Sequence, residues 1–296
     1  MTNAPVTDAL RPRRSVLYMP GANARALEKA AGLPADALIL DLEDAVAPDQ
    51  KASARAQVAD AVAADRYGRR EAAVRVNGLD TDWFQDDLAA VAQVGPDAVL
   101  VPKVSSAADV VTIVDALDEL GVPATTSLWA MLETPAAVLH AEEICAASDR
   151  LTVLVMGTND LAKELQVPHV PGRAPLLTSL SWCVLAARNA GKIIIDGVFN
   201  DLGDADGFVA ECRQGRELGF DGKTLIHPKQ LDGANTSFAP SDEDVEVARE
   251  VVAAFEEAQA QGQGVVTVGG KLIEALHVEQ ARQTIAQAEA IAALDA

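Results

Sequence analysis

Residues 15–44 read SVLYMPGANARALEKAAGLPADALILDLED and contain the pattern from which the architecture can be predicted. It begins with the apolar run SVLYMP (15–20), continues through the Ala-rich amphipathic stretch Ala24–Ala31, and ends with the run ALILDLE (37–43). Both runs are continuously apolar rather than alternating, which is typical of parallel strands covered on both faces. A helix is the usual connection between such strands. The stretch therefore predicts one strand–helix–strand unit.

The same rhythm repeats along the chain. Further β-rich runs read AAVRVN, AVLVPK, SLWAMLE, LTVLVMGT, IIIDGVF and KTLIHP, at residues 72–77, 98–103, 127–133, 151–158, 193–199 and 223–228. Amphipathic stretches recur between them, at Ser53–Ala64, Ala107–Leu120, Ala136–Ala147 and Ala205–Leu218. Eight strands with intervening helices favour a (β/α)8 barrel, or TIM barrel, over an open doubly wound sheet. The glycine-rich nucleotide-binding fingerprints are missing from the sequence.

The pattern changes after the eighth run. Ser241 precedes an Asp-Glu-Asp triplet and an apolar stripe, which predicts a capped amphipathic helix. A Gly-rich segment (262–277) and a final amphipathic helix follow, and a glycine hinge of this kind is typical of mobile closing elements. We expect a flexible N-terminal arm at residues 1–12, a TIM barrel at 13–235 and a C-terminal helical extension or lid at 236–296.

Composition excludes several classes of protein. The chain has 24 Lys and Arg against 44 Asp and Glu, a net charge of −20, so it should repel nucleic acids and anionic membranes. No apolar run approaches the roughly 18 residues of a membrane span, and no apolar block follows the first charged residues as in a secretory signal. Three isolated cysteines, Cys145, Cys183 and Cys212, suit a reducing compartment. We expect a cytoplasmic protein with no nucleic-acid or membrane partner.

Polar residues close most of the predicted strands, and function in a (β/α)8 barrel collects where the strands end. Burying so many charges at one mouth is costly unless they pair or bind something. Acids outnumber bases among them, so a bound divalent cation would resolve the imbalance. These residues are Asp41, Glu43, Asp44, Arg75, Asn77, Lys103, Glu133, Asn159, Asp160 and Asp196.

The best metal-ligand pair is Glu133 and Asp160, which follow adjacent predicted strands. Carboxylates without Cys or His partners select a hard ion, so we expect Mg²⁺, with Mn²⁺ as an alternative, rather than zinc. Glu43 and Asp44 would act on the ion through its bound waters. The alternative is that these acids cap helices or pair with nearby bases.

Arg75 is the natural clamp for an anion, because a guanidinium holds a carboxylate or enolate oxygen bidentately. The alternative is a structural salt bridge to Glu43 or Asp44, which also end a predicted strand. Sequence alone leaves both open.

The densest positive stretch of this acidic chain flanks the first strand and the start of the first helix. It comprises Arg11, Arg13, Arg14, Arg25 and Lys29. Such a cluster could receive phosphates, with help from the helix N-terminus. The alternative, a solvated flexible arm, fits Arg11 and Arg13 better than Arg25 and Lys29.

Several segments together resemble the HpcH/HpaI aldolase–citrate lyase β-subunit family, in its CoA-ester lyase branch. The resemblance runs from residue 13 to residue 293 and implies a (β/α)8 barrel in a homotrimer or homohexamer, with a C-terminal element over a neighbour's site. The segments are RRSVLYMPGAN, ALILDLEDAVAPDQK, VRVNG, VPKV, MLETPAAV, GTNDLAKEL, IDGVFNDLGDADGF and GKTLIHPKQ, in this order.

The resemblance implies roles for individual residues. Glu133 of LETP and Asp160 of GTNDL match the Mg²⁺ ligands, and Arg75 matches the arginine that binds the substrate's oxygens. The residues that fall where the family contacts coenzyme A are Tyr18, Arg25 and Lys29.

The C-terminal motif departs from the family. It reads GGKLIEALH and places Glu274 where relatives usually carry an Asp that reaches a neighbouring subunit's site. The added methylene shifts a proton-transferring carboxylate by about 1 Å. From the resemblance, Glu274 is the expected base, and Asp196 or Asp44 are the next candidates. Glu43 and Asp44 are expected to support the reaction.

The implied activity is reversible, Mg²⁺-dependent carbon–carbon cleavage of a 3-hydroxyacyl-CoA such as malyl-CoA, methylmalyl-CoA or citramalyl-CoA. The products are acetyl-CoA or propionyl-CoA and a 2-oxo acid, glyoxylate or pyruvate. The metal would polarise the carbonyl, and Arg75 would steady the oxygen that becomes negative. The alternatives are a malyl-CoA thioesterase or malate-synthase-like activity at the same site, a CoA-independent pyruvate aldolase, and a noncatalytic subunit.

Overall fold

The computed structural model describes residues 10–295, and the chain divides into two compact units. The larger unit runs from Arg13 to Phe238, and the other contains residues 239–295 together with 10–12. The predicted boundary at residue 235 lies inside a helix that ends at Phe238. Residues 1–9 of the expected N-terminal arm lie outside the described part of the chain.

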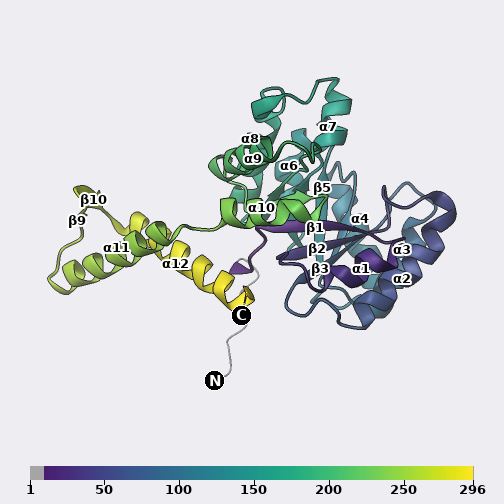
Figure 1. Ribbon diagram of the computed structural model, residues 1–296, viewed down its shortest axis with the longest axis horizontal. Coiled ribbons are helices and arrows are strands. Elements are labelled where there is room, and N and C mark those ends of the chain that lie inside the picture. Colours follow the sequence, from purple (N-terminus) through teal and green to yellow (C-terminus); the bar gives the residue numbers. More distant parts are fainter. Residues whose placement is uncertain (1–9, 296) are drawn as a thin grey trace. The chain divides into compact units, whose positions relative to one another are not determined.

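Eight parallel strands close into a barrel in sequence order, with β8 hydrogen-bonded to β1 (Figure 1). This confirms the predicted (β/α)8 barrel. All strands but β1 end earlier than the predicted runs, whose last residues belong to the segments that follow the strands. The strands are β1 (Ser15–Pro20), β2 (Ala37–Asp41), β3 (Glu71–Arg75), β4 (Ala98–Val101), β5 (Ser127–Leu132), β6 (Leu151–Met156), β7 (Ile193–Asp196) and β8 (Gly222–Leu225).

Helices surround the barrel. One predicted helix, Ala136–Ala147, is divided in two because His140 leaves helical geometry at φ −102° and ψ 13°. The barrel helices are α1 (Ala24–Ala30), α2 (Lys51–Ala63), α3 (Phe84–Val94), α4 (Ala107–Glu119), α5 (Pro135–Leu139), α6 (Ala141–Ala146), α7 (Thr158–Leu165), α8 (Leu177–Asn189), α9 (Ala205–Leu218) and α10 (Leu231–Phe238). Short 3-10 helices in the described part of the chain include η2 (Pro48–Gln50), η3 (Pro171–Arg173) and η4 (Pro228–Gln230).

Alternate strand residues build two apolar layers. Ile39 and Ile195 face the barrel interior, whereas Leu38 and Leu40 pack against the helices. Fully burying each such side chain contributes about 1.5–3 kcal/mol. The fully buried Trp129 fills the lower interior, so the barrel is a packed core rather than a pore.

Two of the predicted phosphate-binding arginines are structural instead. Arg13 is 2% exposed, pairs with Glu71 at 2.5 Å, and lies 5.7 Å from the Trp129 ring centroid. Arg14 is 5% exposed and pairs with Asp36 at 2.8 Å. Both precede β1 and therefore lie at the amino ends of the strands, away from the mouth. The expectation that Arg13 belongs to a solvated arm, and that both join a phosphate patch, is wrong.

The C-terminal unit is helical, as predicted. Ser241 caps α11 (Asp242–Ala260) with a reciprocal capping box to Asp244. The antiparallel strands β9 (Val266–Val268) and β10 (Lys271–Ile273) follow, and then α12 (Ala275–Asp295). A small apolar core within this unit joins Val251 and Phe255 to Val278 and Ala281 of α12.

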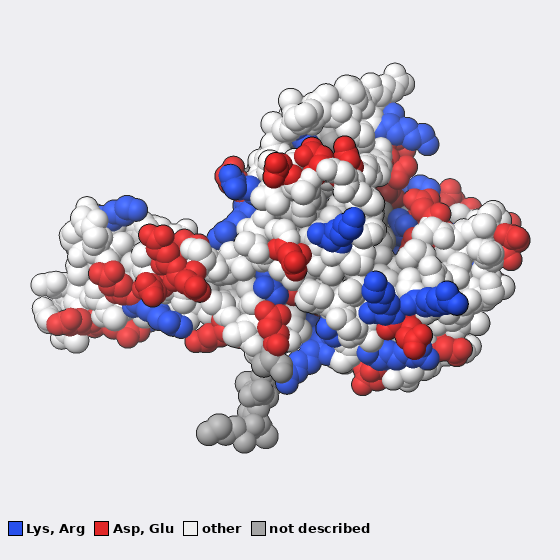
Figure 2. Space-filling view, in the orientation of Figure 1, with Lys and Arg blue, Asp and Glu red and all other residues white. Residues whose placement is uncertain are grey.

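Acidic side chains are spread over both units on the face shown in Figure 2, in keeping with the net charge of −20. Among the residues described, no helix combines the length and the apolar character that crossing a membrane requires.

Candidate active site

A cavity of about 310 Å³ opens at the carboxyl ends of the barrel strands. It brings together five of the predicted site residues, which come from β1, β3 and the segments that follow β2, β5 and β6. These residues are Tyr18, Asp44, Arg75, Glu133 and Asp160. Asp41, Met131, Met156, Asn159, Val198 and Thr224 also line the cavity.

Glu133 follows β5 directly and is 3% exposed. Its Oε1 accepts a hydrogen bond from the backbone N–H of Lys103 at 2.8 Å. Burial, with the negative charges of Asp160 and Glu43, raises the pKa of Glu133 to about 8. A buried carboxyl facing a second carboxylate is stabilised as an anion only when a cation joins them.

The backbone around Glu133 is shaped to leave it room. A Cβ built on Gly157 would lie 2.3 Å from the Glu133 Cβ and 2.4 Å from its Oε2, so any side chain there displaces the carboxyl. Lys103 has a φ of 57°, the left-handed region that non-glycine residues seldom adopt. This conformation aims the Lys103 N–H at Glu133, and such strain is common at functional sites.

Asp160 lies in the first turn of α7, which begins at Thr158 immediately after Gly157. The partial positive charge of a helix N-terminus favours a carboxylate at this position. The loop between β6 and α7 is short, because only Gly157 separates the two elements, and it holds Asp160 beside Glu133 at the barrel mouth.

Arg75 ends β3 and is 7% exposed. Its Nε and Nη2 each donate to a carboxylate oxygen of Asp41 at 2.7 Å, and Nη1 lies 2.9 Å from Glu43 Oε2. Its guanidinium carbon lies 4.9 Å from the centroid of the Tyr18 ring. Although burial opposes the charge, the Asp41 carboxylate raises the pKa of Arg75. The predicted salt bridge to Glu43 exists, and Arg75 lines the cavity as well.

Hydrogen bonds hold the segment after β2 in one conformation. Asp41 accepts hydrogen bonds from the backbone of Glu43 and Ala45, at 2.9 and 3.1 Å. The buried ammonium of Lys51 donates to the carbonyls of Leu42 and Glu43, at 2.8 and 2.7 Å. These contacts fix the backbone that presents Glu43 and Asp44. Sequence reasoning missed the roles of Asp41 and Lys51.

Glu43 lies between two bases. Beyond its contact with Arg75, its Oε1 is 3.6 Å from Lys103 Nζ. Burial raises the pKa of Glu43, and the charge of Arg75 partly offsets this. Asp44 is more open, with 70% of its side chain exposed, and lies 3.8 Å from Arg75 Nη1.

The donor set at Glu133 and Asp160 fits a hard cation. Both are oxygen donors that line one cavity, and burial, followed by the negative charge of Asp160, raises the pKa of Glu133. No group of three or more His, Cys, Asp or Glu with metal-binding geometry occurs among residues 10–295. A two-carboxylate site suits magnesium, which keeps several waters and takes further ligands from its substrate.

Four predicted site residues lie outside the cavity lining, and one of them, Glu43, still contacts Arg75 of that lining. Arg25 and Lys29 are exposed on α1, four residues apart and thus on one helix face. Glu274 belongs to the C-terminal unit, where it is exposed and its backbone N–H donates to His277 Nδ1 at 3.0 Å.

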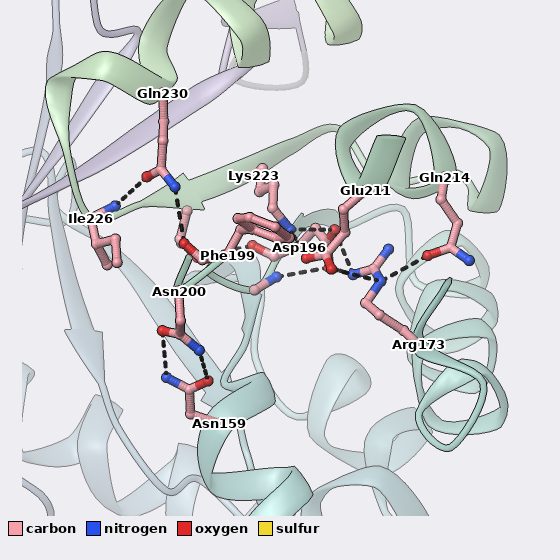
Figure 3. Close-up of polar contacts among 12 residues, drawn as sticks. Asn159, Arg173, Asp196, Phe199, Asn200, Glu211, Gln214, Lys223, Ile226 and Gln230 are labelled. Carbon is pink, nitrogen blue, oxygen red and sulfur yellow. Dashed lines mark hydrogen bonds and ion pairs between the residues drawn. The ribbon is translucent and has the colours of Figure 1, made fainter. Parts of the chain in front are cut away.

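Asp196, considered as an alternative base, is instead a structural ion-pair partner (Figure 3). It is fully buried and contacts Arg173 Nη1 at 2.7 Å and Lys223 Nζ at 3.0 Å. Burial raises and the charges of Lys223 and Arg173 lower the pKa of Asp196, with a net downward shift. Lys223 also contacts Glu211 of α9 at 2.8 Å. The network lies between the barrel wall and α9, so Asp196 does not reach the cavity.

Fold and site together define a class: a (β/α)8 barrel with two carboxylates and a buried arginine around the cavity at its mouth. Residues 14–228 match the family described as HpcH/HpaI aldolase/citrate lyase. The chain belongs to this family of enzymes, as the sequence motifs predicted.

Individual relatives cover nearly the whole chain. A (3S)-malyl-CoA thioesterase of Cereibacter sphaeroides is 55% identical over 96% of this chain and 98% of that protein. An L-malyl-CoA/beta-methylmalyl-CoA lyase of the same species is 37% identical, over 96% of each. The solved structure of CitE from Mycobacterium tuberculosis, in complex with magnesium, acetoacetate and coenzyme A, matches with a TM-score of 0.76. Its identity is 30%, over 93% of this chain and 97% of that one.

Proposed function

We propose that this protein is a magnesium-dependent enzyme that hydrolyses the thioester of (3S)-malyl-CoA or a closely related 3-hydroxyacyl-CoA. The observation that carries the proposal is the convergence of Glu133 and Asp160 with Arg75 on one cavity. The 55% identity to a (3S)-malyl-CoA thioesterase supports hydrolysis ahead of the carbon–carbon cleavage that the sequence motifs first implied.

The residues divide the work by charge. Glu133 and Asp160 would hold magnesium, which when bound supplies Lewis acidity to a substrate oxygen. Arg75 binds an anionic oxygen of the substrate through the Nη N–H groups that Asp41 and Glu43 leave over. In hydrolysis, water oxygen bonds to the thioester carbon, the C–S bond breaks, and the sulfur takes a proton. Glu274 of an adjacent subunit remains the proposed base, and Glu43 and Asp44 would orient metal-bound waters.

Carbon–carbon cleavage is the second candidate. It uses the same carboxylate pair and arginine, and the 37% identity to an L-malyl-CoA/beta-methylmalyl-CoA lyase over 96% of the chain favours it. The two reactions differ in which bond breaks, so their products separate them.

One assay decides between them. Purified protein with Mg²⁺ and malyl-CoA is followed for free thiol and for glyoxylate. Hydrolysis releases thiol without glyoxylate, whereas cleavage releases glyoxylate and acetyl-CoA without thiol. Thiol formation from acetyl-CoA plus glyoxylate identifies a malate-synthase-like activity, and no product from any of these substrates contradicts the proposal.

Arg25 and Lys29 are the proposed contacts for the coenzyme A phosphates. Reversing both charges, Arg25→Glu with Lys29→Glu, should raise KM for malyl-CoA about tenfold through lost charge complementarity. The matched control is Arg66→Glu, an exposed arginine near the end of α2. An unchanged KM in the double variant contradicts this assignment.

A further inference from the structure

A second cavity, of about 420 Å³, lies beside the active-site cavity. Val198 lines both, so at this point one residue's thickness separates them. The second cavity is bounded by the segment after β7, by the loop before η3 and by the first turns of α9. The active-site residues do not use it.

A pair of side-chain amides crosses the same boundary. Asn159, next to the proposed metal ligand Asp160, lines the active-site cavity, and Asn200 lines the second cavity. Each donates to the other: Asn159 Nδ2 to Asn200 Oδ1 at 3.3 Å, and Asn200 Nδ2 to Asn159 Oδ1 at 2.7 Å (Figure 3). Both asparagines are partly open to solvent, and together with Val198 they form the boundary between the two cavities, here called the wall.

The segment that carries Asn200 is anchored on both sides. Gln230 donates to the Phe199 carbonyl at 2.9 Å and accepts from the Ile226 N–H at 3.0 Å, which ties the segment to the end of β8. The Phe199 ring packs edge-on against Phe208 of α9, with centroids 5.9 Å apart. At the base of the segment, the buried Asp196 accepts from the Gly197 N–H at 2.8 Å. The backbone on this side of the wall is therefore fixed. Substituting an asparagine should change the wall without moving this backbone.

The chemistry behind the wall differs from that in front of it. The active-site cavity contains Arg75, whereas the described residues that line the second cavity include no lysine or arginine. Its lining includes three carboxylates: Glu211 is paired with Lys223, whereas Asp201 and Asp204 accept hydrogen bonds from backbone N–H groups. This space repels a further carboxylate and accepts an uncharged chain, whose apolar contacts would be Val198 and Phe199.

Resting on the proposed function, we propose that the Asn159–Asn200 pair determines specificity. It limits the acid part of the substrate to a short chain at the hydroxyl-bearing carbon, and the cavity behind it would take an uncharged extension of that carbon.

The test removes one of the two amides that form the wall. Asn200→Ala deletes the amide that does not line the active-site cavity. Three substrates are compared: malyl-CoA, and malyl-CoA carrying an added ethyl or an added carboxymethyl group on the hydroxyl-bearing carbon. We expect the kcat/KM of the ethyl compound, relative to malyl-CoA, to rise about tenfold, since a pocket discriminates methylenes by roughly this factor. The ratio for the carboxymethyl compound should stay within about twofold of wild type, because like charges repel in the lining.

Asp201→Asn is the matched control. Asp201 lines the second cavity and accepts from the Gly203 N–H at 2.8 Å, a role that Asn can keep, and the amide wall stays intact. Its ethyl ratio should equal that of wild type. If Asn200→Ala fails to fold, Asn200→Ser carries the same expectation.

Two results overturn the inference while the proposed function stands. One is an ethyl ratio in the Asn200 variant equal to that of wild type, and the other is an equal rise for the ethyl and carboxymethyl compounds. A wild-type protein without malyl-CoA turnover contradicts the proposed function itself, and the inference falls with it.

Discussion

Asp41 holds the guanidinium of Arg75 through both of its carboxylate oxygens, at 2.7 Å each. The guanidinium is therefore held in one orientation at the cavity, with its central carbon 4.9 Å from the centroid of the Tyr18 ring. A bidentate charged pair restricts the guanidinium far more than a single contact does.

Asp41→Asn should lower kcat/KM about 10- to 100-fold, the usual cost of losing an orienting partner of a site residue. Magnesium affinity depends on other residues and should stay near wild type. Asp86→Asn, which removes an exposed partner of Arg55, serves as the control. A variant that loses thermal stability but keeps its kcat/KM shows that Asp41 is structural only.

Glu133→Gln and Asp160→Asn should each abolish Mg²⁺-dependent turnover, with kcat/KM lower by about 10³-fold or more, because metal polarisation supplies several kcal/mol. Gln keeps an oxygen for the Lys103 N–H, so Glu133→Gln should fold normally. Calorimetric Mg²⁺ titration measures the loss of binding. Activity that survives in either variant, or in wild type treated with a chelator, contradicts the metal site.

Magnesium affinity should depend on pH. The pKa of Glu133 is about 8 in the metal-free protein, so below that pH the carboxyl must release a proton before it binds the ion. The apparent Kd should fall about tenfold from pH 6 to pH 7 and level off above pH 8. Titration calorimetry in buffers of different ionisation enthalpy measures the released proton. A Kd that is flat between pH 6 and pH 8 argues against this linkage.

The same shift affects the stability of the metal-free protein. Its sign follows from proton binding: between pH 4.5 and about 8 the folded state holds the Glu133 proton more tightly than the unfolded chain does. This contribution to the free energy of unfolding is complete at low pH and is lost as the pH rises toward 8. Denaturant titrations of wild type and Glu133→Gln, compared across this range, isolate it.

Mixed subunits test the proposed role of Glu274. Glu274→Ala and Arg75→Ala should each be nearly inactive alone. If the C-terminal unit acts on a neighbouring subunit, mixing the two proteins should restore part of the activity after subunit exchange, since some sites then contain both residues. A mixture of Glu274→Ala with Glu274→Gln is the control and should stay inactive. A mixture of the first pair that also stays inactive argues against action in trans.

The barrel could be predicted because its signal is local. Buried parallel strands are continuous apolar runs, and each of the eight appears in the sequence without reference to its neighbours. The ends were harder to place, since residues such as Glu43 and Asn159 belong to the loop or helix that follows the strand. The candidate site followed from the same logic, because strand ends converge in a barrel.

Pairing between distant segments could not be predicted. Arg13 looks like part of a basic arm until Glu71, 58 residues away, is seen beside it. Asp196 likewise resembles the other acids at strand ends, yet Arg173 and Lys223 neutralise it on the outer side of the barrel wall. A charge's role depends on its partner, and the partner is set by the three-dimensional fold.

The buried Trp129 side chain restricts how molecules reach and leave the barrel interior. Because the Trp129 indole, with the Arg13 guanidinium 5.7 Å from its ring centroid, fills the interior at the amino-terminal end, the barrel is closed there. Substrate and product must therefore pass through the same opening, at the carboxyl ends of the strands. The larger fragment has to leave before a fresh substrate can enter, and its departure is then a natural limit on the speed of the catalytic cycle.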